Sequence, residues 1–165
     1  AGMIRACAAI ENARHVYIVG RGAAYPAAYQ FAYAYRLFRD NGVLVDGHAG
    51  AFGDELRGIG RRDLMIVVAA KPYIRDTVRA VDFARSQHCP VIAISDSDVS
   101  PIALDAMTKL VVRDTSQSFF QSFTAALSVM QALVALLVAR GGQKALQRIS
   151  AAEEQLAAFD TYFED

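Results

Sequence analysis

Residues 15–30 read HVYIVGRGAAYPAAYQ, and this stretch decides the fold. The apolar and β-branched run from His15 to Val19 ends at Gly20 and predicts a short buried strand. A tight loop of small residues follows. A helix is predicted from Tyr25 to Asp40, because a proline such as Pro26 is tolerated in a first helical turn. Strand, glycine loop and helix in this order are typical of an α/β unit.

The rest of the chain continues this alternation. Strands are predicted at 43–45, 64–68, 90–94 and 107–112, and helices at 3–13, 51–57, 74–87, 101–105, 119–140 and 143–162. Short apolar strands between helices indicate a parallel sheet that is covered on both faces. We therefore expect a three-layer, doubly wound α/β fold with five strands in the flavodoxin-like order 2-1-3-4-5.

Length and charge limit the organisation of the protein. The 165 residues fit a single domain with an N-terminal helix at 2–13, an α/β core at 15–140 and a C-terminal helix at 143–162. Lys and Arg number 17, as do Asp and Glu. This balance disfavours a protein that holds DNA by itself, because such proteins usually carry a basic surplus.

Composition also bears on compartment and cofactors. Cys7 and Cys89 lie far apart beside apolar residues, which is typical of buried, reduced thiols. The residues at the start do not resemble a signal peptide, so a cytoplasmic location is expected. The three histidines are scattered, and neither a metal nor a cofactor is expected.

The uncharged segment from Thr115 to Ala139 is long enough to span a bilayer. It is interrupted by serines, glutamines and a threonine, and only about its last ten residues are continuously apolar, too few to cross a bilayer. The favoured interpretation is a helix buried in a core or a subunit interface, with no membrane.

Two loops are the main candidates for a ligand site, because open parallel sheets bind ligands beyond the carboxyl ends of their strands, where the strand order reverses. In the first, Gly20 to Ala24, small residues and the start of a helix favour an anion. The alternative is that this turn only lets the strand and helix pack. The loop is neither a dinucleotide fingerprint nor a P-loop.

The second loop runs from Ala69 to Thr77. Lys71 and Arg75 bring positive charge to the same edge and Thr77 a hydroxyl, although all three also fit solvated or capping roles. The polar loop 95–100 offers several oxygen ligands for a metal, but turn formation before Pro101 is the favoured role. Residues 115–118 form the last polar cluster at this edge.

Aromatic residues cover two sides of the helix that begins at Tyr25. Tyr25, Tyr29 and Tyr33 share one face, whereas the opposite side carries Phe31, Tyr35 and Phe38. Core or dimer packing is the expected role of both faces.

Four segments together resemble a known family: HVYIVGRGAAYPAA, MIVVAAKPYIRDTVRAVDFAR, CPVIAISDSDVSPIALDAMTKLVV and DTSQSFFQSFTAALSVMQALVALL. Over nearly its whole length the chain resembles the SIS (sugar isomerase) domain, and most closely the C-terminal effector domain of RpiR-type bacterial transcriptional regulators. The resemblance implies a homodimer or tetramer that binds a sugar phosphate or a similar anion. It also implies that the ligand changes the DNA affinity of an N-terminal helix-turn-helix domain, which we expect to lie outside this chain.

The ligand-binding residues that follow from the loops and the resemblance are Gly20, Arg21, Gly22, Ala23, Ala24, Ala70, Lys71, Tyr73, Ile74, Arg75, Thr77, Ser95 and Ser116. Many SIS domains carry serine or threonine where this chain has Ala23, Ala24 and the run from Ala69 to Ile74. Each lost hydroxyl contact to a phosphate removes about 1.5–3 kcal/mol. The ligand is then a different anion, or the pocket is vestigial, unless Arg21, Lys71 or Arg75 compensates.

A sugar isomerase needs a positioned acid and base. The ligand-edge loops offer His48, Asp54, Glu55, Asp96 and Asp98, but no two of them have the spacing of a catalytic pair. No catalytic residue is therefore assigned, and a non-enzymatic sensor is the favoured function. An SIS-type isomerase and a structural dimerisation module are the alternatives.

Overall fold

The computed structural model describes residues 1–113 and 115–163. Its five parallel strands form one sheet in the order β2-β1-β3-β4-β5, which confirms the predicted topology. The strands are β1 (Val16–Gly20), β2 (Gly42–Val45), β3 (Leu64–Ala69), β4 (Val91–Ser95) and β5 (Thr108–Val111). The helices are α1 (Gly2–Asn12), α2 (Tyr25–Arg36), α3 (Phe52–Glu55), α4 (Arg75–Ser86) and α5 (Thr124–Ala158), with 3-10 turns η1 (Gly22–Ala24) and η2 (His48–Gly50).

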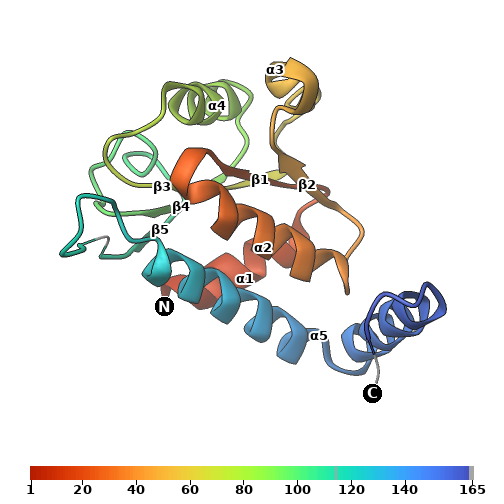
Figure 1. Ribbon diagram of the computed structural model, residues 1–165. Coiled ribbons are helices and arrows are strands. Elements are labelled where there is room, and N and C mark those ends of the chain that lie inside the picture. The colour runs from red at the N-terminus through yellow and green to blue at the C-terminus, as the bar shows by residue number, and fades with distance from the viewer. Residues whose placement is uncertain (114, 164–165) are drawn as a thin grey trace.

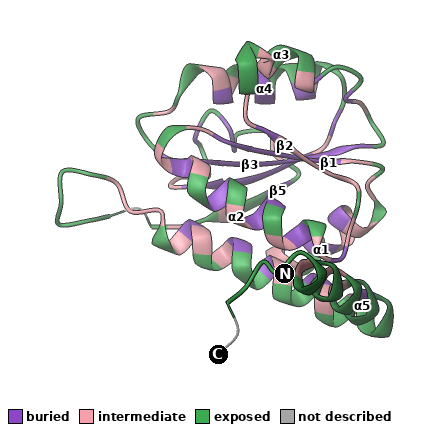
Figure 2. Ribbon diagram, turned by 45° about the vertical axis from the view of Figure 1, so that its right-hand side comes forward, coloured by how far each residue is buried: buried purple, intermediate pink, exposed green. Residues whose placement is uncertain are grey.

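Helices cover both faces of the sheet (Figure 1). One layer contains α1, α2 and α5, and the other contains α3 and α4 (Figures 1 and 2). Alternate residues of β3 point to the two layers: Ile66 and Val68 belong to the core below α2, and Met65 and Val67 to the core below α4. Burial on both faces is why these strands are apolar throughout.

The aromatic faces of α2 have different environments. Phe31, Tyr35 and Phe38 are buried in the core, where the Phe31 and Tyr35 rings stack with centroids 5.6 Å apart. Tyr29 and Tyr33 are exposed on the other side, with ring centroids 6.5 Å apart. Only the first set therefore contributes to the core of this chain.

Several predicted helix bounds were wrong. Helix α5 begins at Thr124, whereas a start at residue 119 was predicted. Before it, the hydroxyls of Ser116 and Ser118 accept hydrogen bonds from backbone N–H groups two residues further on, at 3.0 and 3.3 Å. Such local bonds compete with helix formation.

Three further helix predictions covered too many residues. Residues 101–105 form turns rather than the predicted short helix. Helix α2 ends at Arg36, four residues before the predicted end, and then continues as turns. Helix α5 ends at Ala158 and not at residue 162.

Helix α5 bends at Gly142, whose φ of 54° and ψ of −141° are not helical. This is where the sequence predicted a break between two helices. Before the bend, Ala126, Met130, Leu133 and Leu137 pack into the core. Just beyond the bend, Ala145 still packs into the core, and the far end of α5 projects from the body (Figure 1).

Helix α5 also has the length and composition of a membrane span, with a mean hydropathy of 1.6 over an 18-residue window of which 22% is buried. A single helix of this kind is weak support for a membrane protein, because core helices of soluble proteins meet the same criterion. The packing of its inner face fits the core role that was predicted from the sequence.

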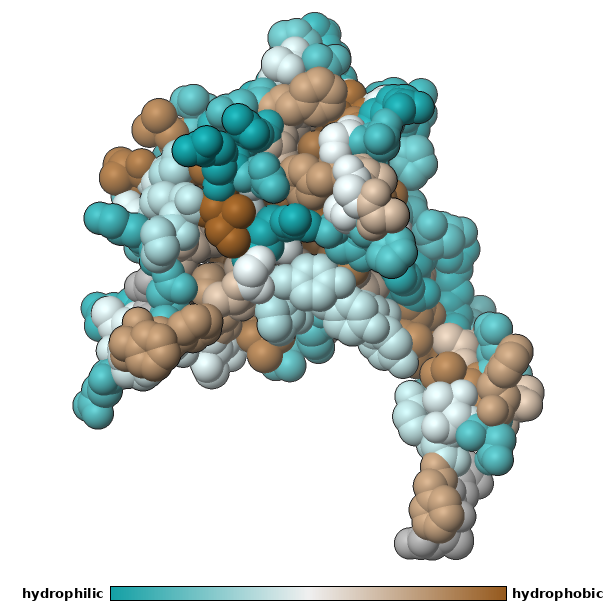
Figure 3. All heavy atoms as spheres, turned by 45° about the horizontal axis from the view of Figure 1, so that its top comes forward, coloured by the Kyte–Doolittle hydropathy of each residue, from teal (hydrophilic) through white to brown (hydrophobic). Residues whose placement is uncertain are grey.

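Two projections give the molecule an open side. The segment before α5 and the far end of α5 extend from the body and flank a hollow (Figure 3). Apolar side chains lie on both projections (Figure 3). Phe119, in the segment before α5, and Phe163, after the end of α5, are almost fully exposed.

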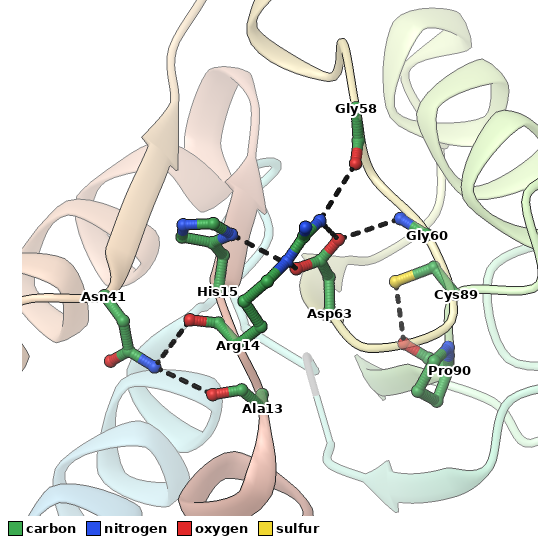
Figure 4. A network of polar contacts seen from close by, with 9 residues as sticks. All are labelled: Ala13, Arg14, His15, Asn41, Gly58, Gly60, Asp63, Cys89 and Pro90. Atoms are coloured by element: carbon green, nitrogen blue, oxygen red, sulfur yellow. Dashed lines mark hydrogen bonds and ion pairs between the residues drawn. The ribbon is translucent and has the colours of Figure 1, made fainter.

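A buried carboxylate ties the amino ends of two neighbouring strands together (Figure 4). Asp63, just before β3, has a fully buried side chain that accepts hydrogen bonds from Arg14 Nε at 2.9 Å and Nη2 at 2.7 Å. The N–H of Gly60 donates a further bond at 2.9 Å, and His15 Nδ1 lies 3.2 Å from the carboxylate. Burial alone would raise the pKa of Asp63, but these hydrogen bonds outweigh it and lower the pKa.

Candidate functional site

The predicted ligand loops meet at the carboxyl edge of the sheet. Gly20 ends β1 in a crowded position, because a Cβ there would lie 2.8 Å from Ala28 Cβ and 2.9 Å from the Ala24 carbonyl oxygen. Gly22 has a φ of +56°, and a Cβ on it would lie 2.7 Å from Ile74 Cδ1 in the second loop. Both glycines are therefore needed to bring β1, α2 and the second loop together.

Between the first and second loops there is only a narrow cavity of about 30 Å³. Its walls are mostly apolar and comprise Arg21, Ala23, Ala24, Ala69, Ala70, Pro72, Ile74, Thr77, Gln121 and Phe123. The Gln121 side-chain amide donates to the Lys71 carbonyl and so joins the segment before α5 to the second loop. A space of this size holds a water molecule but not a sugar phosphate.

A wider pocket adjoins this cavity on the side of β2. Its volume is about 430 Å³, within the range of small-molecule sites, and its lining comprises Arg21, Gly22, Tyr25, Asp46, His48 and Ile74. Arg21 and Ile74 line both spaces, so the two form one continuous candidate site.

The Arg21 side chain is held in the wide pocket by uncharged partners. Its Nη1 donates to the backbone carbonyl of Asp46, and its guanidinium lies 4.9 Å from the centroid of the Phe52 ring. Neither contact neutralises the guanidinium charge. Arg21 therefore presents a positioned cation to the pocket.

The loop after β2 is shaped around this arginine. Gly47 adopts a left-handed φ of +69°, and a Cβ there would lie 3.0 Å from Arg21 Nη1. The Gly47 N–H donates to Glu55 Oε2 at 3.0 Å, and the His48 N–H donates to Asp46 Oδ1 at 2.8 Å. These bonds fix the turn that carries Asp46 and His48.

Other predicted site residues lie apart from both spaces. Lys71 and Arg75 are exposed and line neither of them. Tyr73 donates from its hydroxyl to Asp96 Oδ1 at 2.7 Å, and Ser95 donates to the same oxygen at 3.0 Å. Burial and the hydrogen bond between Tyr73 and Asp96 raise the pKa of Tyr73 to about 12. Ser116 is exposed in the segment before α5. The binding roles of these five residues stay predictions.

The site also contains residues that the sequence prediction did not include. Tyr25, Asp46 and His48 line the wide pocket but were not assigned to ligand binding, although His48 had been named at the ligand edge as a possible acid or base. The predicted strand order could have indicated these residues. Because β2 lies next to β1 in a parallel sheet, the loop after β2 must lie at the same edge as Gly20.

A metal centre finds no support in residues 1–113 and 115–163, where no three His, Cys, Asp or Glu residues gather. The polar loop 95–100 instead bonds within itself, as the hydroxyl oxygens of Ser95 and Ser100 lie 2.8 Å apart in a hydrogen bond. Such bonding fits the turn that was favoured from the sequence.

Comparison with known proteins gives the family. A family model described as the SIS domain matches residues 9–136. The chain belongs to the SIS domain family. The curated proteins contain no match to this sequence.

Solved SIS structures share its fold. The sugar isomerase domain of the RpiR transcription factor from Sphaerobacter thermophilus is 27% identical, with a TM-score of 0.86, over 93% of this chain and 86% of the other. The Vibrio vulnificus NanR protein, in complex with ManNAc-6P, is 17% identical, with a TM-score of 0.80, over 96% of this chain and 61% of NanR. The Methanococcus jannaschii protein MJ1247, with an inferred function of 3-hexulose-6-phosphate isomerase, is 15% identical, with a TM-score of 0.72, over 89% of this chain and 83% of the other.

These neighbours include regulator domains as well as isomerase-like proteins, so the SIS fold alone does not distinguish sensor from enzyme.

Proposed function

We propose that this SIS domain is the effector-binding part of an RpiR-type transcriptional regulator and that it senses a sugar phosphate or a similarly anionic sugar. The observation that carries the proposal is the likeness to the RpiR domain of S. thermophilus, at 27% identity over 93% of the chain. The wide pocket beside Gly22 supports it, because the pocket has the volume of a small-molecule site and contains the Arg21 guanidinium, which is held by a backbone carbonyl and an aromatic ring. DNA would be contacted through a helix-turn-helix domain elsewhere in the regulator.

A sensor fits the described residues better than an isomerase does. His48 lines the wide pocket, but its neighbour Asp46 is engaged with the His48 backbone N–H, and Glu55 accepts from Gly47. Asp96 is occupied by Tyr73 and Ser95. Each of these carboxylates holds a loop in place, and among the described residues none of them is hydrogen-bonded to the His48 ring as the partner of an acid–base pair.

We further propose that two copies associate through α5 and α2. The outer face of α5 before the bend is uncharged, comprising Ser128, Gln131, Ala132, Ala135, Leu136 and Ala139. Helix α2 packs beside α5 and adds the exposed rings of Tyr29 and Tyr33. An uncharged surface with tyrosines is typical of the centre of a subunit interface.

Thermal unfolding in the presence of sugar phosphates, ManNAc-6P among them, tests the sensor proposal. We expect a saturable rise in Tm without turnover, since a ligand at one hundred times its Kd adds about 2.7 kcal/mol of stability. An unchanged Tm across a broad panel would favour the structural module. Conversion of an aldose or ketose phosphate that is lost in His48→Ala would establish an isomerase.

A further inference from the structure

The two parts of the candidate site differ in whether they can hold an anion. The narrow part between the first two loops has only about 30 Å³, and its mostly apolar walls include Pro72, Ile74 and Phe123. Arg21 and Gln121 also reach it, and Arg21 is shared with the wide part. Thr77 supplies its hydroxyl, and Thr77 is itself buried. A space of this size holds a water molecule but not a phosphate group, so an anion can reach the Arg21 guanidinium only from the wide part.

The wide part offers the opposite environment. Arg21 is fixed by the Asp46 carbonyl and the Phe52 ring, and both contacts leave its charge available. Gly47 leaves room for the guanidinium where any other residue would crowd it. A cation that is positioned before the ligand arrives binds more tightly, because less side-chain freedom is lost on binding.

On this basis we propose that the anionic group of the ligand binds Arg21 in the wide pocket on the β2 side, and not the second loop with Lys71 and Arg75. The inference rests on the proposed function, of which it names the anion subsite. Arginine suits this role because its planar fork of donors matches phosphate and carboxylate oxygens.

The same pocket limits the class of ligand. The Asp46 carboxylate lines it, and its Oδ1 accepts a hydrogen bond from the His48 N–H. A carboxylate with one such bond can still accept further hydrogen bonds from hydroxyl groups. A carboxylate repels a second negative charge but accepts hydrogen bonds from sugar hydroxyls. The ligand is therefore a polyhydroxylated molecule with one anionic group, such as a sugar monophosphate or a sugar acid.

The test compares three substitutions that each remove one positive charge: Arg21→Gln, Lys71→Gln and Arg75→Gln. The probes are inorganic phosphate, glucose 6-phosphate and glucose, with binding followed by the backbone amide signals in NMR titrations. We expect phosphate and glucose 6-phosphate to shift the amides of Gly22, Gly47 and His48. Arg21→Gln should weaken phosphate binding about 10- to 100-fold, whereas the two second-loop variants should change it by less than about threefold.

Arg21→Lys separates binding from folding, because it keeps the charge but loses the fork of donors. It should retain the wild-type Tm and bind phosphate with an affinity between those of the wild type and Arg21→Gln.

If phosphate instead shifts the amides of residues 70–77 and binding fails in Lys71→Gln or Arg75→Gln, the subsite is wrong while the sensor proposal stands. If phosphate binds at Arg21 but no sugar phosphate binds more tightly, the subsite stands and the sensor proposal fails. An absence of any phosphate binding overturns the subsite.

Discussion

Gly20 shows how one residue of the first loop serves packing rather than binding. A Cβ at this position would meet a backbone atom of η1 and side-chain atoms of α2 and β3 at 2.8 to 2.9 Å. We expect Gly20→Ala to reduce the free energy of unfolding by about 1–3 kcal/mol through overpacking. Urea denaturation measures the change. Gly53→Ala is a matched control, because a Cβ there would have no neighbour within 4 Å, and an equal loss in both variants would contradict this account.

Asp63 makes stability depend on acid pH. Its pKa in the folded protein is lowered, so it contributes stability above the ordinary aspartate pKa of about 3.9, and this contribution is lost as the pH falls through the folded pKa. Asp63→Asn should cost about 2 kcal/mol at pH 7, because the buried charge-assisted bonds from Arg14 are lost. The variant should also lose less stability than the wild type between pH 5 and pH 3.

The control for Asp63 is Asp54→Asn, which removes an exposed carboxylate that pairs with Arg57 on the surface. Such pairs contribute little, so its denaturation midpoint should follow that of the wild type at each pH. Equal acid sensitivity of Asp63→Asn and the wild type would mean that other carboxylates govern unfolding in this range.

Individual site residues were only partly predictable from the sequence. Gly20, Gly22 and Arg21 were found because a glycine loop between a strand and a helix is a local pattern. Asp46 was not named, and His48 was named at the ligand edge only as a possible acid or base, because their loop has no such pattern and reaches the pocket only through the pairing of β2 with β1. The direction of the Arg21 side chain depends on Phe52 and Gly47, which come about thirty residues after Arg21 in the sequence and so form no local pattern with it.

Among the elements, the strands were predicted more accurately than the helix ends. Strands β1, β3 and β4 are buried along their whole length, so their apolar runs mark their bounds closely. The start of α5 was missed because the serine-rich segment before it is uncharged, like the helix itself. Side-chain bonds of Ser116 and Ser118 to the backbone decide that this segment stays outside the helix.

At the scale of the whole molecule, the order of the five strands was predictable because alternating strands and helices restrict the possible topologies. The association of chains is less predictable from the sequence pattern, because it depends on surfaces rather than on the core. Between Thr124 and Ala139, helix α5 packs one side against α1 and α2 and leaves the other side uncharged and exposed. A stable interface needs about 800 Å² from each partner, and the outer face of α5 with Tyr29 and Tyr33 is a continuous candidate for that area.

Substitutions on this outer face test the association. A glutamate at the centre of an interface would be buried without a partner, so Ala132→Glu and Leu136→Glu should convert the proposed dimer into a folded monomer, with Tm lowered only by the lost stabilisation from association. Analytical ultracentrifugation at micromolar concentration measures the species present. Phe83→Glu is the matched control, because Phe83 is similarly exposed on α4 in the opposite layer and should leave the dimer intact. A wild-type chain that sediments as a monomer would refute the interface, and a dimer that persists in both α5 variants would place it on another surface.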